Sequence, residues 1–137
     1  MRLKDRVAFV TGGSGGLGQA IAERFLEEGA FVVVADIDAA RLEAMVASST
    51  AEAGRLTSVI LDVSDYDKVK AAIDKVVDDF GRLDILVNNA GFSPKKNWLD
   101  YSIAEWKQVI DVNLSGEYYG ARAVAEHMME RQQGRII

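Results

Sequence analysis

Four short apolar runs recur along the chain at nearly regular intervals. They cover 7–10, 31–35, 58–61 and 85–87, begin about 26 residues apart, and are separated by segments with the periodicity of helices. Strands that alternate with helices at this length form βαβ units, in which the strands are parallel. The runs are continuously apolar, as strands covered by helices on both faces require. The sequence therefore predicts an α/β fold with a doubly wound parallel sheet.

The segments between the runs carry the start and stop signals of helices. The first helix is expected to present Leu17, Ile21 and Phe25 on one face and to stop at Gly29. The second is expected to begin near Asp38. Together the expected helices cover about 17–28, 38–53, 64–80, 102–110 and 114–131.

Two of the later helices begin with capping patterns. Ser64 and Asp67 have a spacing like that of a capping box at the start of the third helix, which Gly81 is expected to end. Ser102 and Glu105 form a capping box at the start of the fourth. These signals fix the expected boundaries of the helices.

The chain ends at residues 135–137, which read as the first residues of a fifth buried strand. Domain boundaries normally fall in polar, flexible linkers, and a strand averages about five to six residues. We therefore expect four strands plus a stub of a fifth in an incomplete sheet. Residues 1–137 would form one domain that is truncated at its C-terminal end.

Composition excludes several classes of function. The net charge of -5 argues against nucleic acid or an anionic membrane surface as a partner. The chain has no cysteine and one histidine, His127, so it offers no disulfide, thiolate nucleophile or histidine metal site, and that histidine is expected at the surface. The longest apolar stretch, 31–35, is far shorter than the roughly 20 residues that span a bilayer. We expect a soluble cytoplasmic protein without a metal.

A glycine-rich loop, residues 11–18 with the sequence TGGSGGLG, lies between the first apolar run and the first helix. Glycine lets the backbone approach a ligand without a Cβ, and the helix that follows directs free N–H groups at an anion. A kinase or ATPase phosphate loop is excluded, because Gln19 and Ala20 stand where Lys and Ser/Thr are needed. A flexible turn remains the plain alternative. The candidate nucleotide contacts in this loop are Gly12, Ser14, Gly16, Leu17 and Gly18.

An acidic residue, Asp36, ends the second apolar run 18 residues after Gly18. At this place a carboxylate accepts hydrogen bonds from the ribose of a dinucleotide, and the next residue, Ile37, would border the same site. Asp36 could instead cap the second helix, although Asp38 is better placed for that. Its charge would repel a 2′-phosphate by about 4 kcal/mol at 4 Å and an effective dielectric constant of 20. No Arg or Lys lies in the loop or directly after Asp36, so the sequence favours NAD over NADP.

Further motifs extend this pattern along the chain. In order they are Thr11-Gly12-x-x-x-Gly16-x-Gly18, Asp36, Asp62-Val63, Asn88-Asn89-Ala90-Gly91 and Asn113. As a set they resemble the short-chain dehydrogenase/reductase family over residues 4–137. The resemblance implies a Rossmann-like fold and a nicotinamide cofactor.

The resemblance also implies roles for individual residues. Asp62 would contact the adenine amino group, Val63 would pack on the adenine ring, and residues 89–91 (Asn89, Ala90 and Gly91) would pass beside the adenosine ribose. Asn113 resembles the family's catalytic asparagine, which kinks a helix and holds a water in a proton relay. Each also has a plainer reading: Asp62 as the cap of the third helix, Asn89 as a turn residue and Asn113 as a helix interruption.

The family's catalytic serine and Tyr-x-x-x-Lys would both follow Ile137. The pair Tyr66 and Lys70 has the right spacing but lies at the start of the third helix, beyond the adenine side of the site. Tyr118 has only Arg122 at that spacing, and arginine relays protons poorly. We therefore expect this chain alone to be inactive.

Taken together, the sequence predicts the NAD-binding part of a short-chain dehydrogenase/reductase. The complete enzyme would transfer a hydride between nicotinamide and a small alcohol or ketone, and would form a homo-oligomer. A non-catalytic nucleotide-binding or interaction module remains the alternative. A methyltransferase that binds an adenosyl cofactor would explain neither 88–91 nor Asn113.

Overall fold

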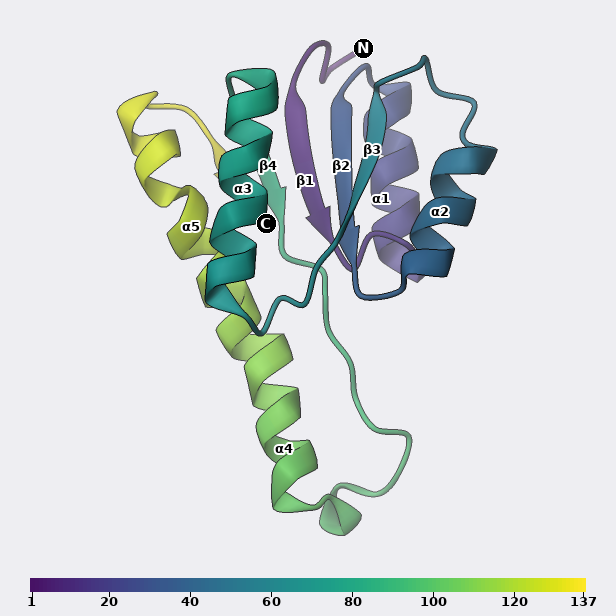
Figure 1. Cartoon of the computed structure of the whole chain (residues 1–137), viewed down its shortest axis with the longest axis vertical. Coiled ribbons are helices and arrows are strands. Elements are labelled where there is room, and N and C mark those ends of the chain that lie inside the picture. Colours follow the sequence, from purple (N-terminus) through teal and green to yellow (C-terminus); the bar gives the residue numbers. More distant parts are fainter.

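The computed structural model describes residues 1–137 and holds one five-stranded parallel sheet in the order β3-β2-β1-β4-β5. Helices α1 and α2 cover one face of the sheet, and α3 and α5 cover the other (Figure 1). The elements are β1 (Val7–Thr11), α1 (Gly16–Glu27), β2 (Phe31–Asp36), α2 (Ala39–Ser48), β3 (Leu56–Ile60), α3 (Tyr66–Phe80), β4 (Ile85–Val87), η1 (Trp98–Asp100), α4 (Ile103–Ile110), η2 (Asp111–Ser115), α5 (Gly116–Glu130) and β5 (Arg135–Ile136). The predicted doubly wound α/β fold is confirmed.

The order of the strands creates a switch point beside β1. From β1 the chain proceeds outward through β2 to β3, and then returns to place β4 and β5 on the other side of β1. Connections therefore leave β1 and β4 in opposite directions at the carboxyl ends of these strands. In parallel sheets of this kind, ligands bind in the crevice that opens at this point.

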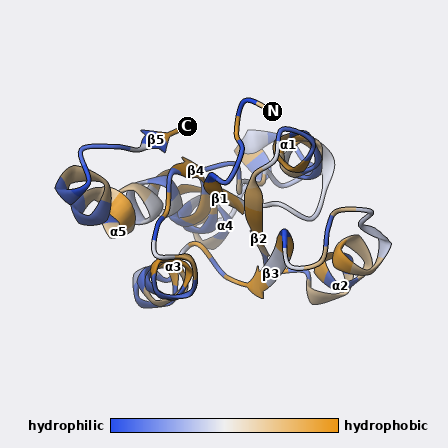
Figure 2. Cartoon of the chain, turned by 90° about the horizontal axis from the view of Figure 1, so that it is seen from above, coloured by the Kyte–Doolittle hydropathy of each residue, from blue (hydrophilic) through white to orange (hydrophobic).

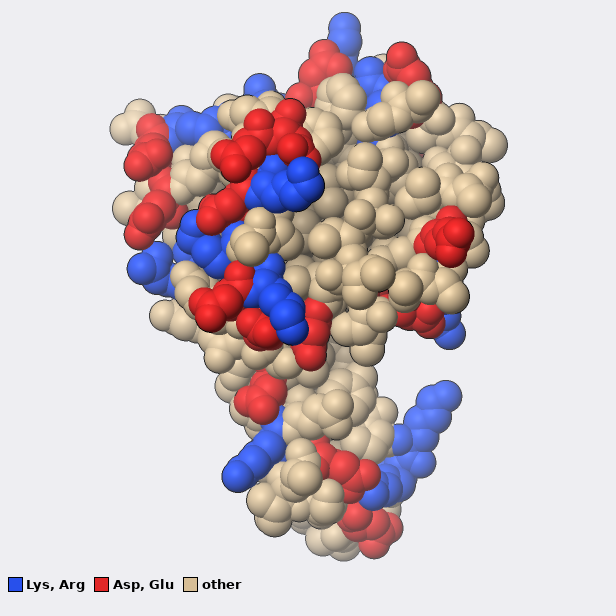
Figure 3. Space-filling model, viewed as in Figure 1, with Lys and Arg blue, Asp and Glu red and all other residues tan.

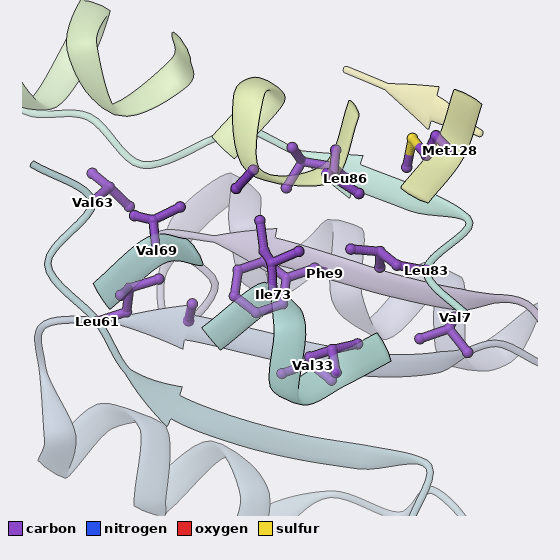
Figure 4. Packing of buried hydrophobic residues seen from close by; sticks show 14 residues of the cluster. Val7, Phe9, Val33, Leu61, Val63, Val69, Ile73, Leu83, Leu86 and Met128 are labelled. Carbon is purple, nitrogen blue, oxygen red and sulfur yellow. The ribbon is translucent and has the colours of Figure 1, made fainter. Parts of the chain in front are cut away.

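The sheet is buried on both faces by two separate clusters. Val7 and Phe9 of β1 point toward α3 and α5, whereas Ala8 and Val10 point toward α1 and α2. Figure 2 shows the hydrophobic central strands between the two layers of helices, and Figure 4 shows the first cluster from close by. Each fully buried Val or Phe contributes about 1.5–3 kcal/mol, so these clusters supply the main driving force for folding.

The third strand differs from its prediction. It covers Leu56–Ile60 instead of 58–61, and of its side chains only Leu56 is buried, while Ile60 is 67% exposed. The prediction of continuous burial is wrong here because β3 lies at the edge of the sheet. The side chains of Thr57 and Ser58 face water there, as an edge strand allows.

Most predicted helix ends are confirmed. Asp38 caps α2 by accepting a hydrogen bond from the N–H of Arg41. Ser102 caps α4 in a complete capping box with Glu105. Gly81 ends α3 in the left-handed conformation that glycine adopts without strain.

Several local predictions are wrong. Helix α2 ends at Ser48 instead of near 53, and β5 is exposed instead of buried, because nothing covers it at the edge of the sheet. The cap of α3 is Asp65, which accepts from the N–H of Lys68, whereas Ser64 turns back to bind the carboxylate of Asp62. Leu17 was expected on the packed face of the first helix, but it is 69% exposed. It lies in the first turn of α1, which starts at the carboxyl edge of the sheet, beyond the buried core.

Helices α4 and α5 are joined by the π-helical turn η2. Residues 92–110 form a projecting arm that extends beyond the carboxyl edge of the sheet, and no residue of α4 is buried (Figure 1). The arm exposes several large apolar side chains: Trp98, Leu99, Ile103 and Trp106. None of the helices has both the length and the apolar character needed to cross a membrane.

Candidate functional site

A cleft of about 540 Å³ opens at the carboxyl edge of the sheet, between the body of the molecule and the arm (Figure 3). Residues from the glycine-rich loop, the ends of β2, β3 and β4, and the arm line it. The predicted site residues on its wall are Gly12, Asp36, Ile37, Asp62, Val63, Asn89, Ala90 and Gly91. Residues separated by almost 80 positions in the sequence thus meet at the switch point.

The remaining predicted contacts, Ser14, Gly16, Leu17 and Gly18, lie in the glycine-rich loop and the first turn of α1. Gly12 and Gly16 have positive φ values of 61° and 51°. A Cβ on Gly12 would lie 2.9 Å from the Cα of Ala90, and a Cβ on Gly18 would collide with the carbonyl oxygen of Gly12. Glycine is therefore needed for the turn and for close contact with the segment after β4.

Helix α1 begins without a side-chain cap, unlike α2, α3 and α4. Asp38, Asp65 and Ser102 cap α2, α3 and α4, whereas Gly15 offers α1 no side-chain cap and its first turn has no acidic residue. No atom lies within 4 Å of the place where a Cβ on Gly16 would stand. The N–H groups of the first turn and the positive end of the helix dipole are therefore free to bind an anion.

Thr11 and Asn89 hold this loop in place. The Asn89 side chain donates to the carbonyl oxygens of Thr11 at 3.0 Å and Gly12 at 3.1 Å. The Thr11 hydroxyl accepts from the N–H groups of Asn89 and Ala90, both at 3.0 Å, and donates to the carbonyl of Val87. Sequence reasoning did not include Thr11 among the site residues. Its position as the last residue of β1, directly before the glycines, is the signal that could have identified it.

Asp36 lies on the cleft wall at the end of β2. Its carboxylate accepts from the Ser14 hydroxyl at 2.7 Å and from the N–H groups of Ser14 and Asp38, both at 3.2 Å. Partial burial acts to raise the pKa of Asp36, but these hydrogen bonds and one from the Ile37 N–H outweigh it and lower the pKa. Asp36 is therefore a fixed anion, and its remaining lone pairs can accept from hydroxyl groups in the cleft.

Asp62 and Val63 follow β3 and line the cleft next to the end of β2, where the N–H of Leu61 donates to the carbonyl of Asp36. Asp62 accepts from both the N–H and the hydroxyl of Ser64, at 2.9 and 2.7 Å, and does not cap α3. Val63 is 8% exposed and lies against Gly116, where a Cβ would come within 2.9 Å of its side chain. This wall therefore offers one carboxylate beside an apolar surface, a pairing suited to the edge and face of a heteroaromatic ring.

Asn113 lies in the π-helical turn and connects it to the segment after β4. Its side chain accepts from the N–H of Phe92 and donates to the carbonyl of Phe92, both at 2.8 Å. Asn113 therefore does more than interrupt a helix, because its side chain binds both the N–H and the carbonyl of Phe92 at the start of the arm. Isolated π-helical turns are frequent at functional sites.

Arg41 is the charged residue of the cleft that was not predicted from the sequence. Arg41, five positions after Asp36, belongs to the first turn of α2, which returns its side chain to the cleft beside Gly15. Only the residues of the glycine-rich loop and those directly after Asp36 were considered as cations. Helical periodicity from the Asp38 cap was the signal that could have found it, since the third residue of a helix lies in its first turn.

The other candidates lie outside the cleft. The Tyr66 ring is 5.5 Å from the ring of Tyr119, and Lys70 forms an ion pair with Asp74. His127 is half-buried rather than at the surface, and its Nε2 accepts from the N–H of Leu83 at 3.1 Å. These side chains support α3 and α5.

Known proteins of one family match this chain. The family model described as short chain dehydrogenase matches residues 6–137. Subunit BbsD of the hydroxy(phenyl)methylsuccinyl-CoA dehydrogenase of Thauera aromatica is 39% identical over 137 residues, which are 100% of this chain and 55% of that protein. D-threitol dehydrogenase of Mycolicibacterium smegmatis is 37% identical over 136 residues, which are 99% of this chain and 52% of that protein. A crystal structure of a short chain dehydrogenase from Bacillus anthracis has a TM-score of 0.92 at 33% identity, and the match covers 98% of this chain and 54% of that one.

The chain spans about half the length of the curated relatives it matches. The matched residues include the glycine-rich loop, the cleft residues after β2, β3 and β4, and the π-helical turn. The sheet and its helices superpose on a solved member over nearly the whole chain. The chain therefore belongs to the short-chain dehydrogenase/reductase family, a family of oxidoreductases whose Rossmann fold binds a nicotinamide cofactor.

Proposed function

We propose that the cleft binds NAD and that residues 1–137 form the adenosine- and pyrophosphate-binding part of an NAD-dependent oxidoreductase. The observation that carries this proposal is the cleft itself, which combines an uncapped helix N-terminus with a fixed carboxylate at the end of the next strand. The pyrophosphate would lie over Gly16, Leu17 and Gly18, where free N–H groups suit an anion.

The residues at the ends of β2 and β3 would hold the adenosine. The Asp36 carboxylate would accept hydrogen bonds from the ribose hydroxyls beside Ile37, and Ser14 holds that carboxylate in position. Asp62 would accept from the adenine amino group while Val63 supports the ring. The open space at Gly16 fits the cofactor, because no side chain of this chain enters it.

When bound, the nicotinamide ring supplies the site that accepts or donates a hydride. We propose that the complete enzyme uses it on a small alcohol or ketone, with Asn113 placing a water for proton transfer. No tyrosine lines the cleft, and the only Tyr-x-x-x-Lys of these residues, Tyr66 to Lys70, is not part of its lining. A proton donor matched to a carbonyl is thus missing from residues 1–137, and we propose that they are inactive alone.

The same proposal places the complete protein in the cytoplasm as a homo-oligomer. Large apolar side chains exposed on the arm, in η2 and on α5 support the second point, because such surfaces are usually covered by a partner. The exposed members of this group are Trp98, Leu99, Ile103, Trp106, Leu114 and Tyr118. Sedimentation of the complete protein and cell fractionation test these two points.

Calorimetric titration of residues 1–137 with NAD and with 5′-AMP tests the binding proposal. We expect both to bind at one site, and expect Leu17→Ala, which changes an exposed side chain without removing an N–H, to be tolerated far better than Leu17→Pro, which removes one donor from the first turn of α1. Absence of binding by the folded wild type would contradict the proposal. Turnover of a ketone with NADH by residues 1–137 would contradict the expected inactivity.

A further inference from the structure

Arg41 places a positive charge at the Asp36 end of the cleft. Its Nε lies 3.3 Å from a carboxylate oxygen of Asp38, with which it forms an exposed ion pair at the start of α2. One of its terminal nitrogens lies 3.3 Å from the place where a Cβ on Gly15 would stand. The guanidinium therefore reaches from α2 to the glycine-rich loop and closes this end of the cleft.

A second, shallower hollow lies on the other side of the same guanidinium. Arg41 lines both hollows, and Gly15 is the other residue that they share. The outer hollow also presents Ser14 and Gln19. The Arg41 side chain is 69% exposed, so it can turn toward either hollow without losing buried contacts.

The groups around this point suit a phosphate that is attached to the ribose. Asp36 and Ser14 form one hydrogen-bonded unit, so a ribose held by Asp36 has its hydroxyls beside Ser14 and Gly15. A phosphate on the 2′-hydroxyl would then stand next to the Arg41 guanidinium. Arginine binds phosphate through two parallel hydrogen bonds, which makes it more effective here than a diffuse positive field.

We propose that Arg41 determines nucleotide specificity, by allowing this cleft to hold a nucleotide with a 2′-phosphate, NADP, in addition to NAD. This inference rests on the proposed function, because it assumes that Asp36 faces the adenosine ribose. Asp36 repels the added phosphate, Arg41 attracts it, and Asp38 competes with the phosphate for the guanidinium. NAD remains the better ligand, and NADP binds measurably.

Calorimetric titration of the wild type and of Arg41→Gln with NAD and NADP tests the inference. We expect the wild type to bind both, and the substitution to weaken NADP by about tenfold while NAD changes by less than about twofold, since only the phosphate meets the guanidinium. Repeating the comparison with 2′,5′-ADP and 5′-AMP, which lack the nicotinamide half, should give the same ratio.

Two further variants make the test specific. Asp38→Asn keeps a good helix cap but removes the competing carboxylate, so it should strengthen NADP by about threefold. Arg122→Gln makes the same change of charge at an exposed pair on α5 and should alter neither affinity. Thermal unfolding shows whether each variant is folded.

The outcomes separate the two proposals. NAD binding with an NADP-to-NAD ratio that neither Arg41→Gln nor Asp38→Asn changes would overturn the role of Arg41 and leave the proposed function intact. Loss of NADP and NAD affinity in equal measure in Arg41→Gln would also overturn it. Failure of the folded wild type to bind NAD would overturn the proposed function and this inference with it.

Discussion

Asp84 and Asp36 lie at opposite edges of the same parallel sheet. Asp84 directly precedes β4, is 4% exposed, and accepts from the N–H of Val7 at 2.9 Å and from the guanidinium of Arg82 at 2.6 and 2.7 Å. Arg6 and Arg131 each approach it at 3.3 Å. One carboxylate thus connects β1, β4 and α5 at the amino edge of the sheet.

Asp36 has the same functional group in different surroundings. Its donors are the neutral Ser14 hydroxyl and backbone N–H groups, it forms no ion pair, and it borders an open cleft. The charge of Asp84 is more than compensated within the fold, whereas the charge of Asp36 remains available to a ligand. Asp84 is thus a buried carboxylate surrounded by cations that serves the fold, whereas Asp36 is a half-buried carboxylate held by neutral donors that can serve a ligand.

The largest expected effect is on stability, at the amino edge. Asp84→Asn should lower the free energy of unfolding by about 3 kcal/mol, because it leaves three guanidinium groups around an uncharged amide. Asp36→Asn should lower it by less than about 1 kcal/mol, since the amide oxygen still accepts from Ser14. Urea unfolding of both variants measures the difference, and equal losses would contradict the comparison.

Acid should remove part of the stability that Asp84 supplies. Burial alone would raise its pKa, but hydrogen bonds from Arg82, the Val7 N–H and Arg131, with the charge of Arg82, lower it to about 2. Because the folded pKa lies below the unfolded value, the contribution is complete above about pH 4 and is lost as the pH falls toward 2, by about 2 kcal/mol. Hydrogen bonds from Arg2 to Glu28 and from Lys96 to Glu105 also lower the pKa values of these two partly buried carboxyl groups to about 2.

The difference between wild type and Asp84→Asn isolates the Asp84 contribution from those of the two glutamates. Unfolding free energies measured between pH 7 and pH 2 should converge as Asp84 is protonated in the wild type. A constant difference over this range would show that the charge of Asp84 does not hold the amino edge together.

A smaller effect is expected on binding, at the carboxyl edge. Asp36→Asn should weaken NAD by about tenfold, or about 1.4 kcal/mol, because ribose hydroxyls would donate to a neutral oxygen instead of a charged one. Asp74→Asn, on the exposed face of α3, is the matched control and should leave the affinity unchanged. Calorimetric titration measures both, and an unchanged affinity in Asp36→Asn would remove this residue from the proposed site.

Much of the fold was predictable because its signals are local or periodic. The apolar runs gave β1, β2 and β4 to within one residue, and glycine and capping patterns gave most helix ends. Exposure of β3 and of Leu17 was not predictable, because each depends on what covers it in three dimensions. The prediction that Ser64 caps α3 was wrong because Asp65, the next residue, is an equally good capping residue.

In the candidate site, too, the residues that follow a local pattern were predicted and those brought together only by the fold were not. The motif residues were found because their spacing is fixed by strand ends, and the cleft brings eight of them together. The presence of Arg41 in the cleft was not predicted, because the first turn of α2 brings its side chain back to the cleft although it is five residues after Asp36. The three ion pairs of Asp84 were not predicted either. Their arginines are up to 125 positions apart, from Arg6 to Arg131, and no local pattern links them.

The smallest expected effect concerns Gly15, which separates the requirements of binding from those of folding. Its φ of -153° is extended backbone that any residue adopts, and a Cβ there would meet only the flexible end of Arg41. Gly15→Ala should therefore change the free energy of unfolding by less than about 0.5 kcal/mol. The added methyl group would stand on the cleft wall and should weaken NAD by about threefold.

Gly18→Ala is the contrasting variant, because its Cβ would collide with the carbonyl oxygen of Gly12 and so disturb the fold itself. Thermal unfolding and calorimetric titration of the two alanine variants should give opposite patterns, a loss of affinity alone for Gly15 and a loss of stability for Gly18. If Gly15→Ala bound NAD as well as the wild type does, the ligand would not pass over this part of the loop. The loop and Asp36 would then not form one binding site at the carboxyl edge of the sheet.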